Sequence, residues 1–267
     1  LLDERPDAPQ YGPVGAFHHW GEPYLGYYVA NDEWVIRKHA QMLSDAGVDV
    51  IIIDMTNEVI YLPIVTKLME VYRKMRSEGN RTPQISCVFH TLLPNGKETL
   101  KKMYDNIYSK GLYEELWFRW QGKPLVFCPR EALDAVFTTR HCWCDSREPW
   151  FRDGQRCCPW ADYYPQNYGW DEDPNVAEMM SVAPATHPTD RRDRVQRIGR
   201  SFHNGRQPLT EAEQRSGEGL HFNEQFSRAM EVDPDFLFFT GWNEWSAMRF
   251  INQGEILTLA NNECKIG

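Results

Sequence analysis

The chain has 267 residues, 42% hydrophobic and 25% charged, which predicts one globular domain over residues 1–267 in the size range of an α/β barrel. A formal net charge of −9 argues against a nucleic-acid partner, because an acidic surface repels a polyanion. No apolar run approaches the roughly 20 residues of a membrane span, so we expect no membrane partner.

Short apolar runs alternate with segments of helical periodicity, a pattern that predicts βα units and a parallel sheet. The first half contains three such units, in which Gly47 and Gly79 are the expected helix terminators. In chain order the expected elements are a strand over 14–20, a helix from an N-cap at Asn31 or Asp32 to Leu43, a strand over 48–54 that is buried on both faces, a helix over 62–78, a strand over 83–91 and a helix over 97–110.

The second half is less regular and opens with two strand segments joined at Gln121-Gly122. Residues 146–178 show no sustained period, and a loop of this length is usually functional. The expected elements are strand segments over 115–120 and 123–128, a short helix over 132–136, strands over 137–142 and 180–187, a helix over 219–231, a strand over 235–242 and an eighth strand over 255–259.

Seven or eight strands with intervening helices predict the α/β class and a (β/α)8 TIM-type barrel, with an irregular closing unit as a variant. The alternative is a doubly wound sheet. It is disfavoured because no Gly-x-Gly-x-x-Gly or Gly-x4-Gly-Lys loop follows an early strand.

Polar and aromatic residues close many of the apolar strands, and a barrel carries its catalytic groups at the carboxyl ends of its strands. We therefore expect one shared pocket, although single histidines there also suit a structural role. The 10 Trp and 12 Tyr offer rings that stack on sugars or fill a core. The expected substrate-binding residues are His18, His19, Trp20, Tyr28, Asn57, His90, Trp120, Tyr168, Trp170, His187, Trp242, Asn243 and Trp245.

Glu244 stands between two tryptophans and beside an asparagine, a setting that desolvates a carboxyl group and raises its pKa toward neutrality. Glycosidic cleavage generally needs two carboxyl groups. We predict Glu244 as one of them and Asp54, which ends the most regular strand, as the other. Glu58 is the reserve for Asp54, and Asp171 is a further candidate.

The segment Phe239-Thr240-Gly241-Trp242-Asn243-Glu244-Trp245 resembles the late-strand Trp-Asn-Glu-Trp motif of the family 99-like and family 71-like glycoside hydrolases. Three further segments are similar to those families: Tyr27-Tyr28 with the helix Val35-Ile36-Arg37-Lys38-His39, then Asp45-Ala46-Gly47-Val48-Asp49, and Lys123-Pro124-Leu125-Val126-Phe127. The resemblance implies a (β/α)8 barrel. Family 99 contains retaining endo-α-mannosidases and family 71 contains α-1,3-glucanases.

One position departs from the family pattern. Family 99 has a second catalytic glutamate three positions after the first, where this chain has Ala247. We therefore expect a glycoside hydrolase of polysaccharides or oligosaccharides. Either its second carboxylate comes from another strand, or the chain belongs to a different family with its own chemistry. The alternative is a glycan-binding barrel without catalysis.

A second alternative is a metal-dependent hydrolase that uses His18, His19, Asp54, His90 and His187 as ligands. Adjacent histidines point to opposite faces of a strand, so we favour a protein without metal or cofactor. The arginines of residues 191–206 form either a solvated face or a site for anionic sugars.

Six of the seven cysteines fall into two groups. Cys87 and Cys128 stand in apolar runs and are predicted to be buried thiols. The second group comprises Cys142, Cys144, Cys157 and Cys158. We expect these four to form disulfides or to remain thiols, rather than to bind zinc. We expect a secreted or periplasmic protein, although no signal peptide is present in this chain.

Overall fold

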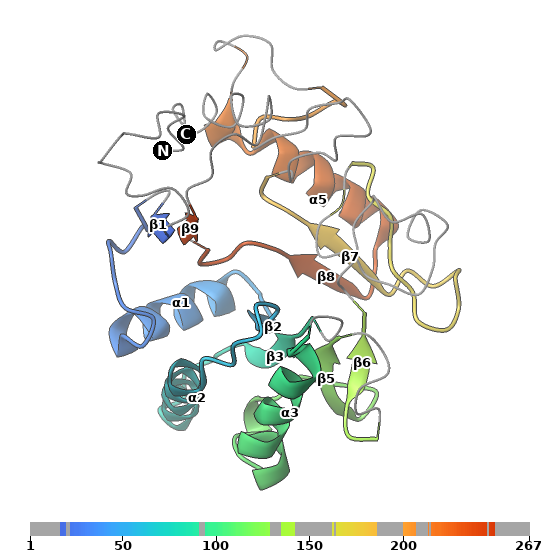
Figure 1. Ribbon diagram of the computed structural model, residues 1–267. Helices are drawn as coiled ribbons and strands as arrows, with labels where there is room; N and C mark the ends of the chain where they lie inside the picture. Colours follow the sequence, from blue (N-terminus) through green and yellow to red (C-terminus); the bar gives the residue numbers. More distant parts are fainter. Residues whose placement is uncertain are drawn as a thin grey trace. The chain divides into compact units, whose positions relative to one another are not determined.

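The computed structural model describes residues 17–19, 22–90, 94–128, 135–141, 162, 164–185, 200–206, 213, 215–244 and 246–248. The chain forms two compact units (Figure 1). Unit 1 comprises Leu1–Gly26 and Cys144–Gly267, and unit 2 comprises Tyr27–Trp143. Among the described helices, none has the length and apolar character that a bilayer crossing requires.

Unit 2 is built on four parallel strands whose spatial order follows the chain. A short strand, β4 (Arg119–Trp120), pairs antiparallel with the start of the third. The parallel strands are β2 (Val50–Asp54), β3 (Gln84–Val88), β5 (Lys123–Phe127) and β6 (Thr138–Arg140). Consecutive parallel neighbours are the pattern of repeated βα units.

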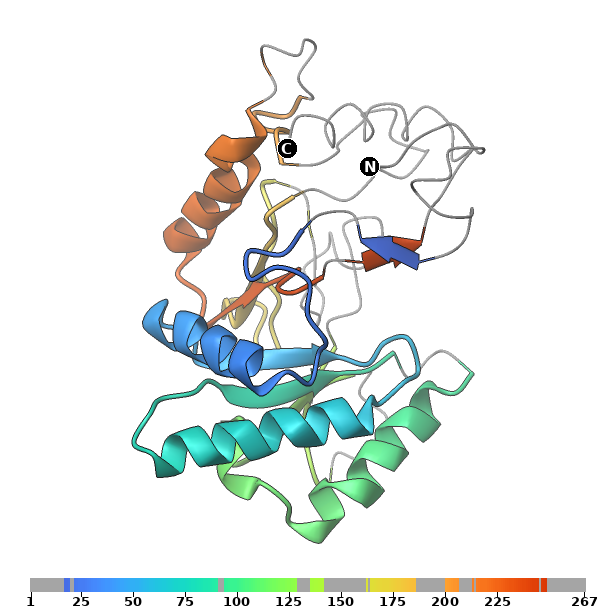
Figure 2. The same cartoon turned by 90° about the vertical axis from the view of Figure 1, so that its left-hand side faces the viewer.

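Three helices cover one face of this sheet (Figure 2). They are α1 (Glu33–Asp45), α2 (Leu62–Ser77) and α3 (Gly96–Asn106). One hydrophobic core contains buried residues of all three, together with Ile85, Cys87 and Val126 from the strands. Because strand side chains alternate between faces, Val50, Ile52 and Asp54 lie on the face away from the helices.

Helix α1 begins where the sequence predicts. The Asp32 side chain accepts hydrogen bonds from the backbone N–H groups of Trp34 at 2.9 Å and Val35 at 3.2 Å. These bonds satisfy donors that the first helical turn leaves without partners. The chain leaves the helix through Gly47, whose φ of +80° costs glycine little.

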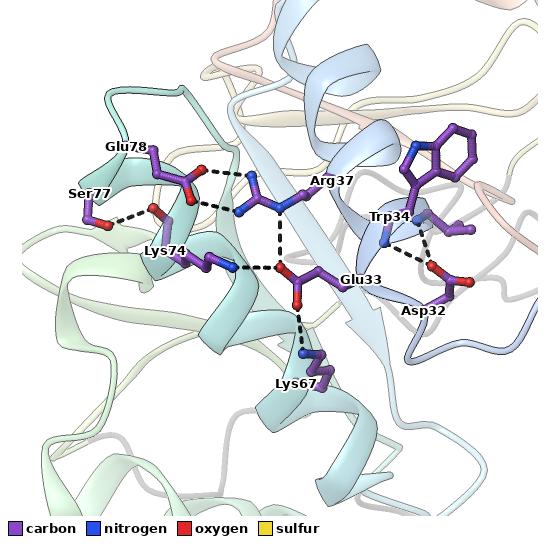
Figure 3. A network of polar contacts seen from close by, with 9 residues as sticks. Asp32, Glu33, Trp34, Arg37, Lys67, Lys74, Ser77 and Glu78 are labelled. Atoms are coloured by element: carbon purple, nitrogen blue, oxygen red, sulfur yellow. Dashed lines mark hydrogen bonds and ion pairs between the residues drawn. The ribbon is translucent and has the colours of Figure 1, made fainter.

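Charged side chains join α1 to α2 (Figure 3). The Glu33 carboxylate accepts hydrogen bonds from Lys67 Nζ at 3.0 Å and Lys74 Nζ at 3.1 Å. Arg37 binds both carboxylate oxygens of Glu78, at 2.8 and 3.0 Å. The lysines hold the pKa of the Glu33 carboxyl at about 2. The network is solvent-exposed and therefore orients the two helices more than it stabilises the fold.

The β4–β5 hairpin turns at Gln121 and Gly122, as predicted. Both residues have positive φ, 52° and 84°, which a two-residue hairpin of type I′ requires at its two central positions. Trp120 pairs with Lys123, the first residue of β5. The hairpin therefore lies at the amino-terminal edge of the parallel sheet.

Unit 1 contains a second parallel pair, β7 (Met179–Val182) and β8 (Phe236–Phe239), joined through α5 (Leu220–Val232). Met180 and Val182 pack against Ala229 of the helix. The buried side chain of Gln225 accepts a hydrogen bond from Ala183 N at 2.7 Å and so fixes the end of β7.

A separate pair in unit 1 departs from expectation. The first strand, β1 (Phe17–His19), runs antiparallel to β9 (Ser246–Met248), with His18 opposite Ala247. A strand of the βα series would have a parallel neighbour. Strand β2 also differs from expectation, since four of its residues are partly buried and Asp54 is exposed, instead of all being buried on both faces. It stands at the end of the described sheet, so one edge lacks a strand neighbour there.

The other expected elements agree closely where they are described. Helices α2, α3 and α5 and strands β3, β6, β7 and β8 overlap the predicted ranges, with ends displaced by one to a few residues. The described strands do not close into a barrel. The short helix over 132–136 falls largely outside the described residues, and the eighth strand over 255–259 lies wholly outside them.

Candidate functional site

A single row of residues crosses the carboxyl ends of the four parallel strands of unit 2. Asp54 pairs with Val88, Val88 with Phe127, and Phe127 with Arg140. Residues in register on parallel neighbours share a face, so Asp54 and Arg140 stand on the face away from the helices. Arg140 is only 7% exposed, whereas Asp54 is exposed. The row carries the predicted carboxylate at the edge where α/β proteins bind ligands.

The loop after β2 is fixed by its own hydrogen bonds. Asp54 Oδ1 accepts a hydrogen bond from Thr56 N at 2.7 Å. Asn57 Nδ2 donates a short hydrogen bond to the Tyr61 hydroxyl. Both residues of this second pair are exposed, in the loop that begins at Asp54. Asn57, a predicted binding residue, therefore lies near the predicted carboxylate with a defined orientation.

Glu58 is engaged elsewhere. Its Oε1 accepts a hydrogen bond from the backbone N of Asn95 at 2.5 Å, at the N-terminus of α3, and its Oε2 accepts one from Asn95 Nδ2 at 3.4 Å. The Thr99 hydroxyl donates to the Glu58 carbonyl at 3.2 Å. A carboxylate at a helix N-terminus also interacts favourably with the helix dipole. Glu58 thus serves α3 as a capping group.

Two histidines lie beyond the ends of β3 and β6. His141 is half-buried, and its burial together with the nearby His90 lowers the pKa of its imidazole, which favours the neutral form. His90 was predicted as a binding residue, and His141 was not. The signal for His141 was present, because it falls at the end of the predicted strand over 137–142.

In unit 1, Glu244 lies on the turn that follows β8. Thr240 N donates to Val182 O at 3.3 Å, so the sheet pairing continues just past the strand. The chain then turns through Gly241 and Asn243, with φ of 87° and 66°, and Glu244 N donates to Gly241 O at 3.4 Å. Glu244 is therefore at the carboxyl end of the parallel pair.

The aromatic enclosure expected around Glu244 is not found among the described residues. Glu244 is exposed, and the neighbouring Trp242 is 54% exposed. The other flanking tryptophan, Trp245, lies outside the described residues. The Glu244 side chain is therefore accessible to solvent.

The remaining predicted residues belong to both units. Trp120 lies at the opposite edge of the sheet from Asp54, because the hairpin reverses the chain before β5. The Tyr168 hydroxyl donates to Pro174 O at 2.9 Å, and Tyr28 contacts His39 edge-on at 5.7 Å. Trp170 and Asp171 are partly buried in the loop before β7.

Further predicted residues lie in parts of the chain whose side chains the structure does not describe. The side chains of His18 and His19 are not described, and Trp20 and His187 lie outside the described residues. Of the arginine-rich stretch, Arg206 pairs with Glu213 at 3.1 Å. The cysteines at 142, 144, 157 and 158 lie outside the described part, whereas Cys87 and Cys128 are buried thiols that form no disulfide, as predicted.

Across the residues that the structure describes, no three His, Cys, Asp or Glu side chains come together as a metal site would require. This observation does not test the metal-dependent alternative, because the side chains of three of its histidines, His18, His19 and His187, are not described.

No protein-family model matches the sequence, and no curated protein matches it. The fold is similar to that of solved glycoside hydrolases. Two structures of a GH99 endo-α-mannosidase from Bacteroides thetaiotaomicron, one in complex with bis-tris-propane, superpose with a TM-score of 0.52. The structure of the complex is 14% identical in sequence, and the match covers 92% of this chain and 88% of the mannosidase chain. The other structure is 15% identical, and the match covers 92% of this chain and 82% of the mannosidase chain. The chain therefore shares the mixed α/β fold of these enzymes.

Proposed function

We propose that the chain is a glycoside hydrolase that cleaves O-glycosidic bonds by carboxylate chemistry. The observation that carries the proposal is the position of two acidic residues, Asp54 and Glu244, each at the carboxyl end of a parallel strand. Catalytic groups of β/α enzymes occupy this edge. The fold shared with GH99 endo-α-mannosidase supports the same reaction class.

We further propose a (β/α)8 barrel as the architecture. Strands β2, β3, β5 and β6 are neighbours in chain order, as barrel strands are, whereas a doubly wound sheet reverses its order at a switch point. The helices α1, α2 and α3 share one core on one face of the strands. A doubly wound sheet carries helices on both faces, whereas all three described α-helices of unit 2 pack on the same face, which favours the barrel.

The reaction needs one carboxyl group that handles the proton of the leaving group and a second that acts as nucleophile or base. Glu244 and Asp54 are our candidates for these two roles. Glu58 is a weaker candidate, because its carboxylate already caps α3. Ala247, where family 99 has its second glutamate, excludes a copy of that pair in this chain.

The test is a screen of purified polysaccharides, with released reducing ends as the readout. We expect release by the wild type from at least one glycan, and loss of release in Glu244→Gln and in Asp54→Asn. The matched control is Glu70→Gln, which removes an exposed carboxylate from α2. Wild-type activity in both site variants would refute the two assignments, and no release from any glycan would refute the enzyme.

A binding function without catalysis is the second candidate, and Ala247 is the observation that favours it. In that case a glycan would be retained by the protein and never cleaved. Glu244→Gln would then leave affinity unchanged, since the carboxylate would have no reacting bond to serve. Affinity gel electrophoresis in the same polysaccharides separates this outcome from hydrolysis.

A further inference from the structure

The loop between β2 and α2 holds two residues in an unfavourable backbone conformation. Glu58 has φ of 67° and Tyr61 has φ of 44°, in the left-handed region that glycine and asparagine tolerate best. Such conformations persist where the surrounding contacts impose them, and they concentrate at functional sites. The backbone of this loop therefore indicates a functional role.

Contacts at both ends of the loop impose this conformation. Met55 N donates to Val88 O at 2.9 Å, which keeps the start of the loop attached to β3. Glu58 N donates to Met55 O at 3.2 Å, and the Glu58 side chain is bound at the N-terminus of α3. At the far end, the Tyr61 carbonyl accepts the N–H groups of Ile64 and Val65, in the first turn of α2.

The result is a fixed aromatic ring in the loop that begins at the predicted carboxylate. The Tyr61 side chain is 39% exposed, and its hydroxyl accepts a hydrogen bond from the Asn57 amide. This bond restrains the ring, so a ligand that stacks on it costs little conformational entropy. Asn57 is itself exposed, and its amide oxygen offers an acceptor to the hydroxyl group of a sugar.

We propose that Tyr61 is a stacking platform for an uncharged pyranose ring, with Asn57 as its polar partner, at the carboxyl edge of unit 2. The site deepens the proposed glycoside hydrolase function and rests on it for the position of the substrate. Aromatic rings with a few polar groups are the usual lining of small-molecule sites. The acidic side chain of Asp54 in the same loop disfavours a sugar that carries sulfate or carboxylate.

The test uses three variants of the full chain. Tyr61→Asn removes the ring and suits the left-handed backbone, so folding is retained. Tyr61→Phe keeps the ring and removes the hydroxyl that Asn57 binds. Trp34→Ala removes another exposed ring of unit 2, on the first turn of α1, and is the matched control. Thermal unfolding checks that each variant is folded.

Affinity gel electrophoresis measures retardation in neutral polysaccharides (mannan, glucan and galactan) and in a sulfated galactan. We expect Tyr61→Asn to weaken retardation in a neutral glycan about tenfold, a typical value for the loss of one aromatic stacking contact. Tyr61→Phe should lose less, and Trp34→Ala should match the wild type. Where a glycan is cleaved, Tyr61→Asn should raise KM and leave kcat nearly unchanged.

The results separate the subsite from the proposed function. Retardation that depends on Tyr61, without release of reducing ends, supports the subsite and refutes the hydrolase. Release with a KM that is unaffected in Tyr61→Asn refutes the subsite alone. Binding restricted to the sulfated galactan, or no retardation of the wild type in any gel, also overturns the subsite.

Discussion

Replacement of His221 should remove part of the acid sensitivity of unit 1. His221 lies on α5, is 0% exposed, and contacts the Phe202 ring at 6.4 Å. Burial lowers the pKa of its imidazole from 6.5 to about 4. The side chain is therefore neutral in the folded protein at neutral pH, and it is charged in the unfolded chain below about pH 6.5.

The magnitude follows from the two pKa values. They differ by about 2.5, and a difference of one in pKa corresponds to about 1.4 kcal/mol, so the largest effect is about 3 kcal/mol. Between pH 6.5 and 4 the unfolded chain binds more protons than the folded one. The free energy of unfolding therefore falls as the pH falls through this window. Above pH 6.5 the imidazole is neutral in both states and has no effect on the pH dependence of stability.

The assay is urea unfolding of wild type and His221→Gln at several pH values from 7.5 to 4. The wild type should lose more stability than the variant over this range, by up to about 3 kcal/mol. His203→Gln, in the same unit, is the control. Parallel curves for wild type and His221→Gln would refute the reasoning. NMR titration of the wild-type imidazole provides a second check, and a pKa near 6.5 would contradict the burial argument.

Two further predictions concern unit 2. Because Lys67 and Lys74 hold the pKa of Glu33 at about 2, its contribution to stability is present above pH 4.5 and is lost as the pH falls toward 2. Between pH 5 and pH 2.5 the melting temperature should therefore fall less for Glu33→Gln than for the wild type, and equal falls would contradict this. Burial raises the pKa of the Cys87 thiol to about 12, so iodoacetamide at pH 8 should modify Cys87 only after unfolding, as peptide mass spectrometry would detect; rapid labelling of the native protein would disprove it.

Local signals predicted most of the helices and turns. Asp32 caps α1 with its own side chain, and Gly47 ends it, as both residue types predict. The turn at Gln121-Gly122 likewise depends on the conformations of two adjacent residues. Such features need only a few neighbouring residues, so the sequence contains the information that determines them.

Strand pairing was harder to predict, because partners come from distant parts of the chain. The apolar run around Phe17 predicted a strand correctly, but nothing local indicated an antiparallel partner near Ala247. Trp120 shows the same difficulty for the site. Its position at the end of a predicted strand suggested the carboxyl edge, whereas the hairpin puts it at the amino edge. Strand ends identify a pocket only when the strand directions are known.

Burial was the second quantity that sequence could not supply. Two flanking tryptophans indicated an apolar setting for Glu244, yet Glu244 is exposed and Trp242 is 54% exposed. His141 shows the converse, since the pKa of its imidazole is lowered by burial and by His90, which lies about fifty residues earlier in the chain.

Substitutions of Glu58 can distinguish a structural role of this carboxylate from a catalytic one. Its Oε1 accepts the Asn95 backbone N–H, and an amide oxygen can accept the same bond. Glu58→Gln should therefore keep nearly full stability and turnover, whereas Glu58→Ala should lose about 1 kcal/mol, as helix caps typically do. Urea unfolding and reducing-end release measure the two quantities. A folded, stable Glu58→Gln without activity would make Glu58 the second carboxylate in place of Asp54, because only loss of the ionisable group distinguishes that variant from the wild type.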